Sequence, residues 1–355
     1  MIKIKYKSRD SLLIVAGIFC LITSCCESIF VEKDSFKLTP LEPLSDEIPY
    51  EELGSGKILF CRNNFSDGSG FYVIDVDKRN SYGFTSNSEM HYPYVSPDGS
   101  KIAYKLSLSD RNFTYGICCM NIDVTNCISV TDSGGGYCPT WSPDGLKILY
   151  YTNSIDGLLY MLSAIENASD RVEMIKFYYG DDPDWFIGPY GGFSMSPDGH
   201  LVCASKGGAK TSGILKIEPN SGKSGVSVLL PEKFTEKPIA SVFSPDGTKI
   251  AFAIHEIDTL EDQGFIWIKS MDPDGTNHTP LARVKISNGV IYSLYPRFMS
   301  RISLCWSPDS KKILFNGPDE QNDGFHLMLV NADGSGLIRV TDKMKADDLY
   351  VSWGR

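Results

Sequence analysis

The sequence predicts an all-β fold, a single six-bladed β-propeller closed by pairing of its N- and C-terminal strands. Three observations predict it. A turn motif recurs at nearly even spacing, each repeat contains four strand-like segments, and the C-terminus carries an unpaired first strand that completes the N-terminal repeat. Repeats of this length with several short strands are typical of propeller blades.

The turn motif marks the join between the first two strands of each repeat. In Ser-Pro-Asp-Gly, proline presets φ at the second position of a type I turn, aspartate suits the third and glycine the fourth. A large apolar residue precedes each serine, and most copies are followed by an apolar strand such as Lys101 to Tyr104. The motif begins at Ser96, Ser142, Ser196 and Ser244, with Ser-Pro-Asp-Ser at Ser307, at separations of 46, 54, 48 and 63 residues.

The strand count predicts a closed ring. Each repeat continues with a third strand, such as residues 115–123, and a fourth, such as residues 128–131. Residues 57–60 form a sixth copy of the second strand, but no first strand precedes them. Residues 350–353 supply it, since Trp353 follows the equivalent Trp306 by 47 residues. Six complete blades result, and joining both termini removes an open sheet edge.

The recurrence in register gives the chain a family resemblance. Residues 57–355 resemble the TolB-like propeller family, whose repeat reads Trp-Ser-Pro-Asp-Gly-Lys-Lys-Ile-Ala-Phe. The family's namesake carries a separate α/β domain before its propeller, and only a short segment, residues 25–56, stands in that place here. We interpret residues 25–56 as a tether, and the match does not imply a role in the Tol-Pal system.

The first residues have the pattern of an export signal. Four basic side chains, from Lys3 to Arg9, precede an apolar run over residues 12–22 that is too short to span a bilayer. The run ends in Leu-Ile-Thr-Ser-Cys, which resembles a bacterial lipobox. The resemblance implies that residues 1–24 are a cleaved lipoprotein signal peptide and that Cys25 becomes acylated, for example with palmitate. An ordinary signal peptide and an uncleaved membrane helix stay open as alternatives.

Lipidation at Cys25 would hold the protein on a membrane, because each buried methylene adds about 0.8 kcal/mol. In enteric bacteria an aspartate after the lipidated cysteine favours retention in the inner membrane, and this chain has Cys26 there. We therefore expect a lipid-anchored protein of the cell envelope, in the outer rather than the inner membrane. Whether it faces the periplasm or the cell surface is open.

Composition argues against nucleic acid as a partner. The chain has a net charge of -10 and no Lys/Arg-rich stretch outside the signal, whereas phosphate binding needs a basic face. We expect a monomeric propeller without cofactor or metal. The adjacent Cys118 and Cys119 lack the gap of a zinc knuckle.

The remaining cysteines divide into two groups. Cys61, Cys203 and Cys305 lie in apolar strand patterns, which is typical of core residues. Disulfides are permitted in an exported chain, and any bridge is expected within the cluster from 118 to 138. Whether disulfides form there is open for Cys118, Cys119, Cys127 and Cys138.

The candidate binding surface is the face opposite the Ser-Pro-Asp turns, because its loops vary in length and function tends to lie on such loops. Two of them, residues 178–190 and 288–301, are long and aromatic. Exposed aromatic residues commonly anchor protein or sugar partners, although these could also fill gaps between blades. Asp181, Asp182 and Asp184 form either a calcium site or a solvated acidic turn. The candidate binding residues are Tyr178, Tyr179, Trp185, Phe186, Tyr190, Tyr292, Tyr295, Arg297 and Phe298.

No catalytic residue can be assigned from the sequence. The chain has no Gly-x-Ser-x-Gly elbow, and its five histidines are dispersed over the repeats. The leading hypothesis is a membrane-anchored, non-catalytic propeller scaffold that binds an envelope protein or a glycan. The second hypothesis is a polysaccharide-active enzyme, a lyase or a glycosidase, with its site at the channel mouth.

Overall fold

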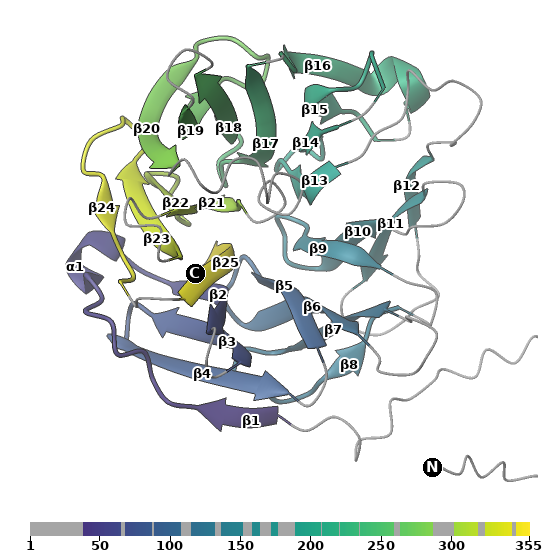
Figure 1. Ribbon diagram of the computed structural model, residues 1–355. Coiled ribbons are helices and arrows are strands. Elements are labelled where there is room, and N and C mark those ends of the chain that lie inside the picture. Colours follow the sequence, from purple (N-terminus) through teal and green to yellow (C-terminus); the bar gives the residue numbers. More distant parts are fainter. Residues whose placement is uncertain are drawn as a thin grey trace, which may run out of the picture.

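The structure, a computed structural model, has the predicted propeller architecture. Small antiparallel sheets surround a common centre, and Figure 1 shows the inner strands gathered there. Around the ring each inner strand contacts the next, in the order β25, β5, β9, β13, β17, β21 and back to β25. The described residues are 38–64, 68–86, 89–107, 115–131, 136–151, 158–163, 172–176, 189–206, 208–219, 221–233, 235–258, 263–286, 302–318, 324–342 and 346–355.

Blades 2 to 5 are regular four-stranded sheets whose strands follow chain order from the centre outward. Blade 2 has β5 (Glu89–Val95), β6 (Lys101–Ser107), β7 (Tyr115–Asn121) and β8 (Ile128–Ser129). Blade 3 has β9 (Tyr137–Trp141), β10 (Lys147–Tyr151), β11 (Leu158–Ser163) and β12 (Val172–Lys176). Blade 4 has β13 (Pro189–Met195), β14 (Leu201–Ser205), β15 (Gly213–Ile217), the 3-10 helix η2 (Gly222–Gly225) and β16 (Val226–Pro231). Blade 5 has β17 (Glu236–Phe243), β18 (Ile250–Asp258), β19 (Gln263–Met271) and β20 (Thr279–Ile286).

Blades 6 and 1 meet where the two ends of the chain join. Blade 6 has β21 (Leu304–Trp306), β22 (Lys312–Pro318), β23 (Phe325–Asn331) and β24 (Ile338–Arg339). Blade 1 has β25 (Ala346–Gly354), β2 (Lys57–Asn64), β3 (Gly68–Asp75), β4 (Asn80–Ser86) and β1 (Leu38–Leu41). β25 pairs antiparallel with β2 from Lys57↔Gly354 to Asn64↔Ala346. The predicted pairing of the terminal strands is therefore confirmed.

Part of the predicted tether packs on blade 1. β1 pairs with β4 as a fifth, outermost strand, from Leu38↔Ser86 to Leu41↔Gly83. A short helix, α1 (Tyr50–Leu53), follows and buries Leu53 against β2. From Leu38 onward, residues assigned to the tether are thus attached to the propeller, while residues before Leu38 lie outside the described part of the chain.

Strand alternation explains how the blades hold together. Along β2, Ile58 and Phe60 pack toward blade 6, whereas Leu59 and Cys61 pack toward blade 2, because successive side chains point to opposite faces of a sheet. The blades therefore share apolar cores between neighbours. Cys61, Cys203 and Cys305 are buried and unbridged, as predicted for core residues.

The Ser-Pro-Asp turns owe their recurrence to a buried serine. In the turn after β5, Ser96 Oγ donates to Asp98 at 2.5 Å and accepts from the Lys101 N–H at 2.9 Å. The Gly99 N–H donates to the Ser96 carbonyl at 2.8 Å, which closes the type I turn. The same serine–aspartate bond occurs at Ser142, Ser196, Ser244 and Ser307.

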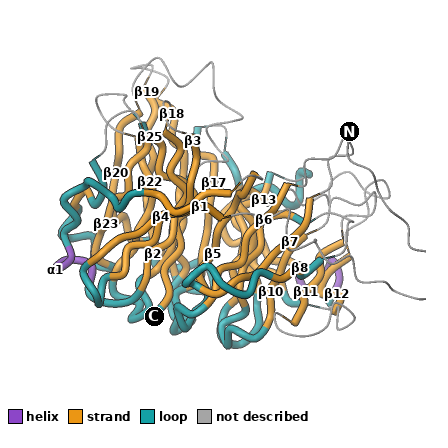
Figure 2. The backbone as a smooth tube through the Cα atoms, turned by 90° about the horizontal axis from the view of Figure 1, so that it is seen from below, coloured by secondary structure: helices purple, strands orange, loops and turns teal. Residues whose placement is uncertain are grey.

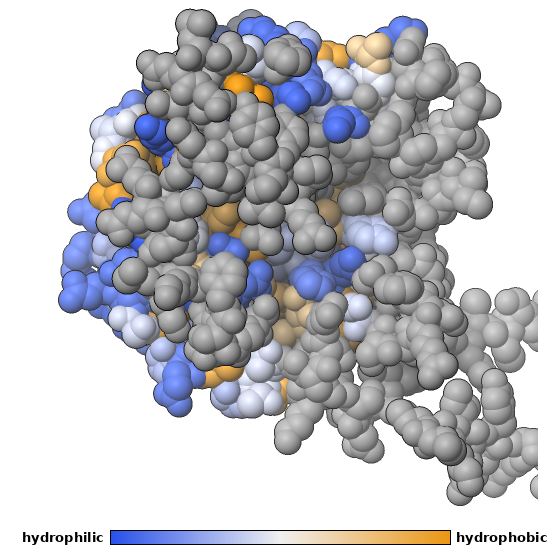
Figure 3. All heavy atoms as spheres, viewed as in Figure 1, coloured by the Kyte–Doolittle hydropathy of each residue, from blue (hydrophilic) through white to orange (hydrophobic). Residues whose placement is uncertain are grey.

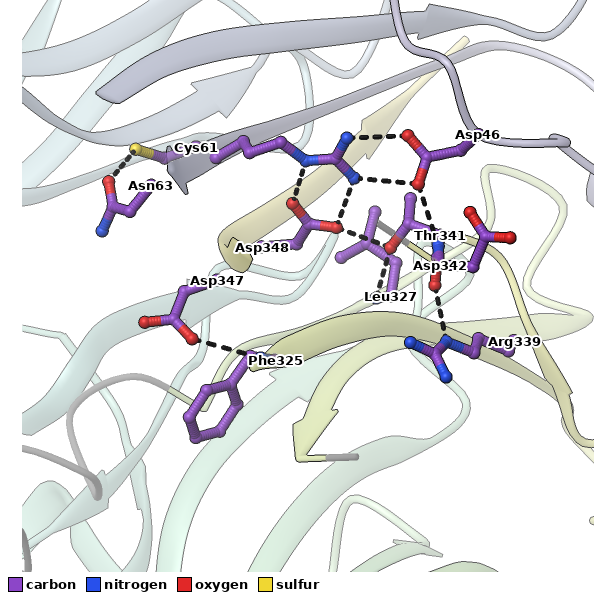
Figure 4. A network of polar contacts seen from close by, with 11 residues as sticks. Asp46, Cys61, Asn63, Phe325, Leu327, Arg339, Thr341, Asp342, Asp347 and Asp348 are labelled. Atoms are coloured by element: carbon purple, nitrogen blue, oxygen red, sulfur yellow. Dashed lines mark hydrogen bonds and ion pairs between the residues drawn. The ribbon is translucent and has the colours of Figure 1, made fainter. Parts of the chain in front are cut away.

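A buried ionic network seals the junction between the two ends of the chain. Arg62 on β2 is 1% exposed, and its Nε and Nη2 donate to Asp348 on β25 at 2.6 and 2.8 Å. Its Nη1 donates to Asp46, in the segment between β1 and α1, at 2.7 Å. Figure 4 shows the carboxylates of Asp46 and Asp348 on two sides of the guanidinium group. Burial opposes the charge, but the hydrogen bonds that Arg62 donates to both carboxylates, with their negative charge, outweigh it and raise the pKa of Arg62.

Further bonds tie this network to blade 6. Thr341, beyond β24, donates its hydroxyl to Asp348 at 2.5 Å and accepts the N–H of Leu327 at 2.9 Å. The Asp342 N–H donates to Asp46 at 2.9 Å. One cation thus links the N-terminal segment, β2, β25 and the end of blade 6.

We predict that Arg62→Met lowers the free energy of unfolding by about 3–5 kcal/mol, because it leaves two buried carboxylates without their cation. The matched control is Arg79→Met, which breaks an exposed ion pair with Glu51 (61% and 78% exposed) and is expected to cost at most about 1 kcal/mol. Urea unfolding of both variants measures the difference. Equal losses would show that the buried network does not hold the junction.

Candidate functional site

A cavity of about 440 Å³ lies on the central axis of the ring. Every blade contributes its inner strand or the residues just before it. The wall therefore exists only when the ring is closed. Its lining includes, one from each blade in turn, Tyr350, Tyr94, Thr140, Phe193, Val242 and Leu304.

The cavity reaches the face that carries the Ser-Pro-Asp turns. The five turn prolines line it, together with the C-terminal Arg355. Figure 2 shows the C-terminus among the short turns at one edge of the molecule. Figure 3, viewed as in Figure 1, shows the face opposite these turns, where the described outer rim is largely hydrophilic and apolar residues appear toward the centre. The turn prolines are Pro97, Pro143, Pro197, Pro245 and Pro308.

Serine hydroxyls in the wall join neighbouring blades. Ser194 Oγ accepts the Phe243 N–H of the next inner strand at 3.0 Å. Ser352 Oγ likewise accepts the Val95 N–H at 3.0 Å, and Ser303 Oγ accepts the Val351 N–H at 3.0 Å. Backbone groups that would otherwise be unsatisfied are thereby paired across the blade boundaries.

Tryptophans before the turns add a second set of bonds between blades. The indole N–H of Trp141 donates to the Tyr94 carbonyl at 3.0 Å, and that of Trp306 donates to the Val242 carbonyl at 3.3 Å. In blade 1 the equivalent Trp353 instead donates to the Ser55 carbonyl, just before β2 of the same blade, at 2.9 Å. The wall is thus fixed by hydrogen bonds as well as by packing, which makes the cavity preorganised for a ligand.

The charge pattern differs between the wall and the mouth. Burial raises the pKa of Tyr94, and neighbouring Cys138, Cys305 and Tyr350 add to the shift, so this hydroxyl stays protonated and can donate. At the mouth, burial raises the pKa of Asp98, but hydrogen bonds from Ser96 and Ser100 outweigh it and lower the pKa overall. The mouth therefore carries fixed carboxylate charge, while the wall offers neutral hydroxyls and apolar surface.

Two tyrosines in left-handed backbone conformations lie deeper along the axis. Tyr92 and Tyr350 have φ values of 52° and 57°, and their rings are 4.5 Å apart. The pairing of β5 with β6 shifts register there, between His91 and Tyr94. A bulge of this kind re-aims side chains.

Blade 2 also holds a buried cation. The Lys105 Nζ lies 4.3 Å from the centre of the Tyr137 ring, an arrangement that stabilises a buried cation.

The predicted aromatic loops are not tested by the structure. Residues 177–188 and 287–301 lie outside the described residues, and with them all the candidates except Tyr190. Tyr190 lies in β13, where it pairs with Ala204. The axial cavity was not predicted from the sequence. The sequence feature that could have indicated the cavity is the position two residues before each turn serine. This position lines the cavity in five blades and holds Tyr94, Thr140, Ser194, Val242 and Cys305.

The described residues include neither a metal-binding cluster nor a membrane-spanning helix. No group of three or more His, Cys, Asp or Glu side chains is placed to hold a metal ion in that part of the chain. Within the same residues, no helix is long and apolar enough to cross a membrane.

Solved structures share the propeller fold. TolB from Acinetobacter baumannii matches with a TM-score of 0.60 and 16% identity, over 84% of this chain and 66% of that chain, so this chain spans just under two thirds of that protein's length. A putative TolB from Agrobacterium tumefaciens matches with a TM-score of 0.50 and 14% identity, over 85% and 100%. An oligogalacturonate lyase from Vibrio parahaemolyticus matches with a TM-score of 0.45 and 12% identity, over 81% and 87%.

These comparisons establish the fold. The chain is a TolB-like propeller in architecture. Fold alone does not define an activity. No protein-family model matches the sequence, and no curated protein matches it.

We predict that Ser194→Ala lowers the free energy of unfolding by about 1–3 kcal/mol, since the buried Phe243 N–H loses its acceptor. Ser241→Ala is the matched control. Ser241 also lines the cavity, but its Oγ has no hydrogen-bond partner among the described residues, so its removal is expected to be neutral or slightly stabilising. Chemical denaturation measures both variants, and a larger loss for Ser241→Ala would contradict this account of the wall.

Proposed function

We propose that the protein is a lipid-anchored envelope protein whose propeller is a non-catalytic scaffold, and that a protein or glycan partner inserts a small group into the axial cavity. The observation that carries the proposal is the preorganised cavity, open on the short-turn face. Its volume, about 440 Å³, lies in the usual range for ligand pockets. A side chain or a sugar unit fits such a volume, but a folded chain does not.

The chemistry of the wall supports recognition. Ser194, Ser303 and Ser352 accept hydrogen bonds between blades, and the mouth carboxylates accept hydrogen bonds within the turns. Groups held in this way provide shape and fixed hydrogen-bond partners. Aromatic residues such as Phe193, Phe243 and Tyr94 supply contact area at low entropic cost.

The anchor proposal rests on the lipobox-like sequence before Cys25. Twelve residues separate Cys25 from Leu38, where β1 begins, and a segment of that length spans at most about 40 Å. The propeller would therefore stay close to the membrane surface. Placement in the outer membrane is part of this proposal.

The aromatic loops predicted on the opposite face remain a second proposed contact region. Trp185 and Phe186 in one loop, and Tyr292 and Tyr295 in the other, would supply exposed aromatic anchors. Binding at the axial cavity and binding at the aromatic loops predict different results in the same assay, so variants of the two regions can be compared directly.

The test is a cross-linking pull-down from native envelopes, with a parallel glycan-binding panel, using wild type and cavity-filling variants. Val242→Trp fills the cavity, and Thr140→Phe repeats the test from another blade with less added volume. Val228→Trp, at a 41% exposed position on β16, is the matched control. We expect the two cavity variants to lose the captured partner and the control to keep it. Thermal unfolding of each variant confirms that it is folded.

Three outcomes would contradict the proposal. Cavity variants that capture the same partner as wild type would rule out the cavity as the binding site. Loss of capture only in the variant Trp185→Ala, Phe186→Ala, Tyr190→Ala would move the site to the aromatic loops. Cleavage of a panel glycan by the wild type would favour the polysaccharide-active enzyme.

A further inference from the structure

Two cysteines of blade 2 lie on the face of the blade that is turned toward blade 1. Cys118 on β7 is directly opposite Tyr104 on β6 and Ser129 on β8. Cys127 precedes Ser129 by two residues, and side chains two apart along a strand share a face. Tyr104, Cys118 and Cys127 thus come from neighbouring segments of one blade. Tyr104 and Cys118 belong to the apolar core between blades 1 and 2.

The three side chains contact one another. The Tyr104 hydroxyl lies 3.0 Å from Cys127 Sγ. The interaction between the two thiols lowers the pKa of Cys127 to about 7 and raises the pKa of Cys118. Tyr104, whose hydroxyl touches Cys127 Sγ, is directly opposite Cys118 across β6 and β7, so the two cysteines lie beside the same side chain on one face of the blade.

Exposure distinguishes the two thiols. Cys127 is exposed, whereas Cys118 and the five other cysteines of the described residues are buried. An external reagent therefore meets Cys127 first and reaches Cys118 only through it. Cys119 is next to Cys118 in sequence but packs on the other face of the blade, toward Trp141 and Ile148.

We propose that Cys118 and Cys127 are a redox-active pair that forms an intrachain disulfide by exchange with a small or protein disulfide. The Cys127 thiolate attacks one sulfur of the external disulfide, forms a mixed disulfide and releases one external thiolate. The Cys118 sulfur, after losing its proton to solvent, then attacks Cys127 Sγ and expels the second external thiolate. Two protein thiols are oxidised and one external disulfide is reduced to two thiols.

The bridge would fasten an outer strand that has little other support. β8 consists of Ile128 and Ser129 alone and pairs with β7 at two positions. A covalent link from β7 to the residue just before β8 would restrain this edge of blade 2. If the chain is exported, as its N-terminal sequence predicts, it would enter a compartment where disulfides persist.

The experiment treats the reduced full chain with oxidised glutathione and maps thiols by differential alkylation and mass spectrometry. Cleavage before Asp123 separates Cys118 from Cys127, so the bridge joins two peptides. We expect these peptides to be linked, with a mass lower by two hydrogen atoms than the reduced pair, and Cys119 to be recovered as a free thiol. Cys118→Ser should leave Cys127 as a glutathione mixed disulfide.

Cys119→Ser is the matched control and should form the bridge as wild type does. Alkylation of Cys127 should reach half its maximal rate near pH 7, the pKa expected for this thiol. A persistent mixed disulfide on wild-type Cys127, a bridge that uses Cys119 or Cys138 instead, or recovery of all these thiols unmodified would each overturn the proposal. None of these readouts depends on the proposed binding function.

Discussion

The pairing of β25 with β2, sealed by Arg62 between Asp46 and Asp348, is the contact on which the rest of the structure depends. β25 is the inner strand of blade 1, and β2, β3 and β4 lie outside it. Without β25 the ring of inner strands is open, and the cores on both sides of blade 1 lose a wall. The buried ion pair adds little net stability by itself, but each charge requires its partners, so it favours one arrangement of the two chain ends.

The same junction builds the candidate site. Tyr350, Ser352 and Arg355 line the cavity, and the Arg355 N–H donates to the Pro97 carbonyl in the blade 2 turn at 3.0 Å. The C-terminal segment and the blade 2 turn approach each other so closely that position 354 must be glycine. A Cβ on Gly354 would lie 2.2 Å from the Ser96 carbonyl oxygen. Closure of the ring and formation of the cavity are therefore one event, and a binding function at the axis would depend on the stability of the junction.

Sequence periodicity was sufficient for the fold because the turn chemistry repeats in every blade. The buried Ser96 and its equivalents each need an aspartate two residues later to accept their hydroxyl hydrogen bond, and a backbone N–H to donate to the hydroxyl oxygen. The same residues therefore recur in every copy, and the pattern was visible without the structure. β1 was missed because four residues containing Pro40 have no clear alternation, and proline is tolerated only at a sheet edge. Arg62 and Asp348 are 286 positions apart, and no local pattern connects them.

The site was harder to predict for a related physical reason. Residues that line the cavity need only fit the axis, so Tyr94, Thr140 and Val242 share a position without sharing a chemistry. The sequence instead predicted a binding surface on two long aromatic loops, whose residues lie almost entirely outside the described ranges. The contact between Cys118 and Cys127 likewise depended on register across β7 and β8, which spacing alone does not fix.

The measurement that tests the central claim most directly is native-state hydrogen exchange of the full chain, comparing β2 and β25 with buried strands of other blades. If the two chain ends close a single cooperative ring, amides of β25 exchange only through global unfolding, with the same opening free energy as those of β14 and β18. Exchange of β25 well before the other blades would contradict the account, because it would show that the ring persists without its terminal strand.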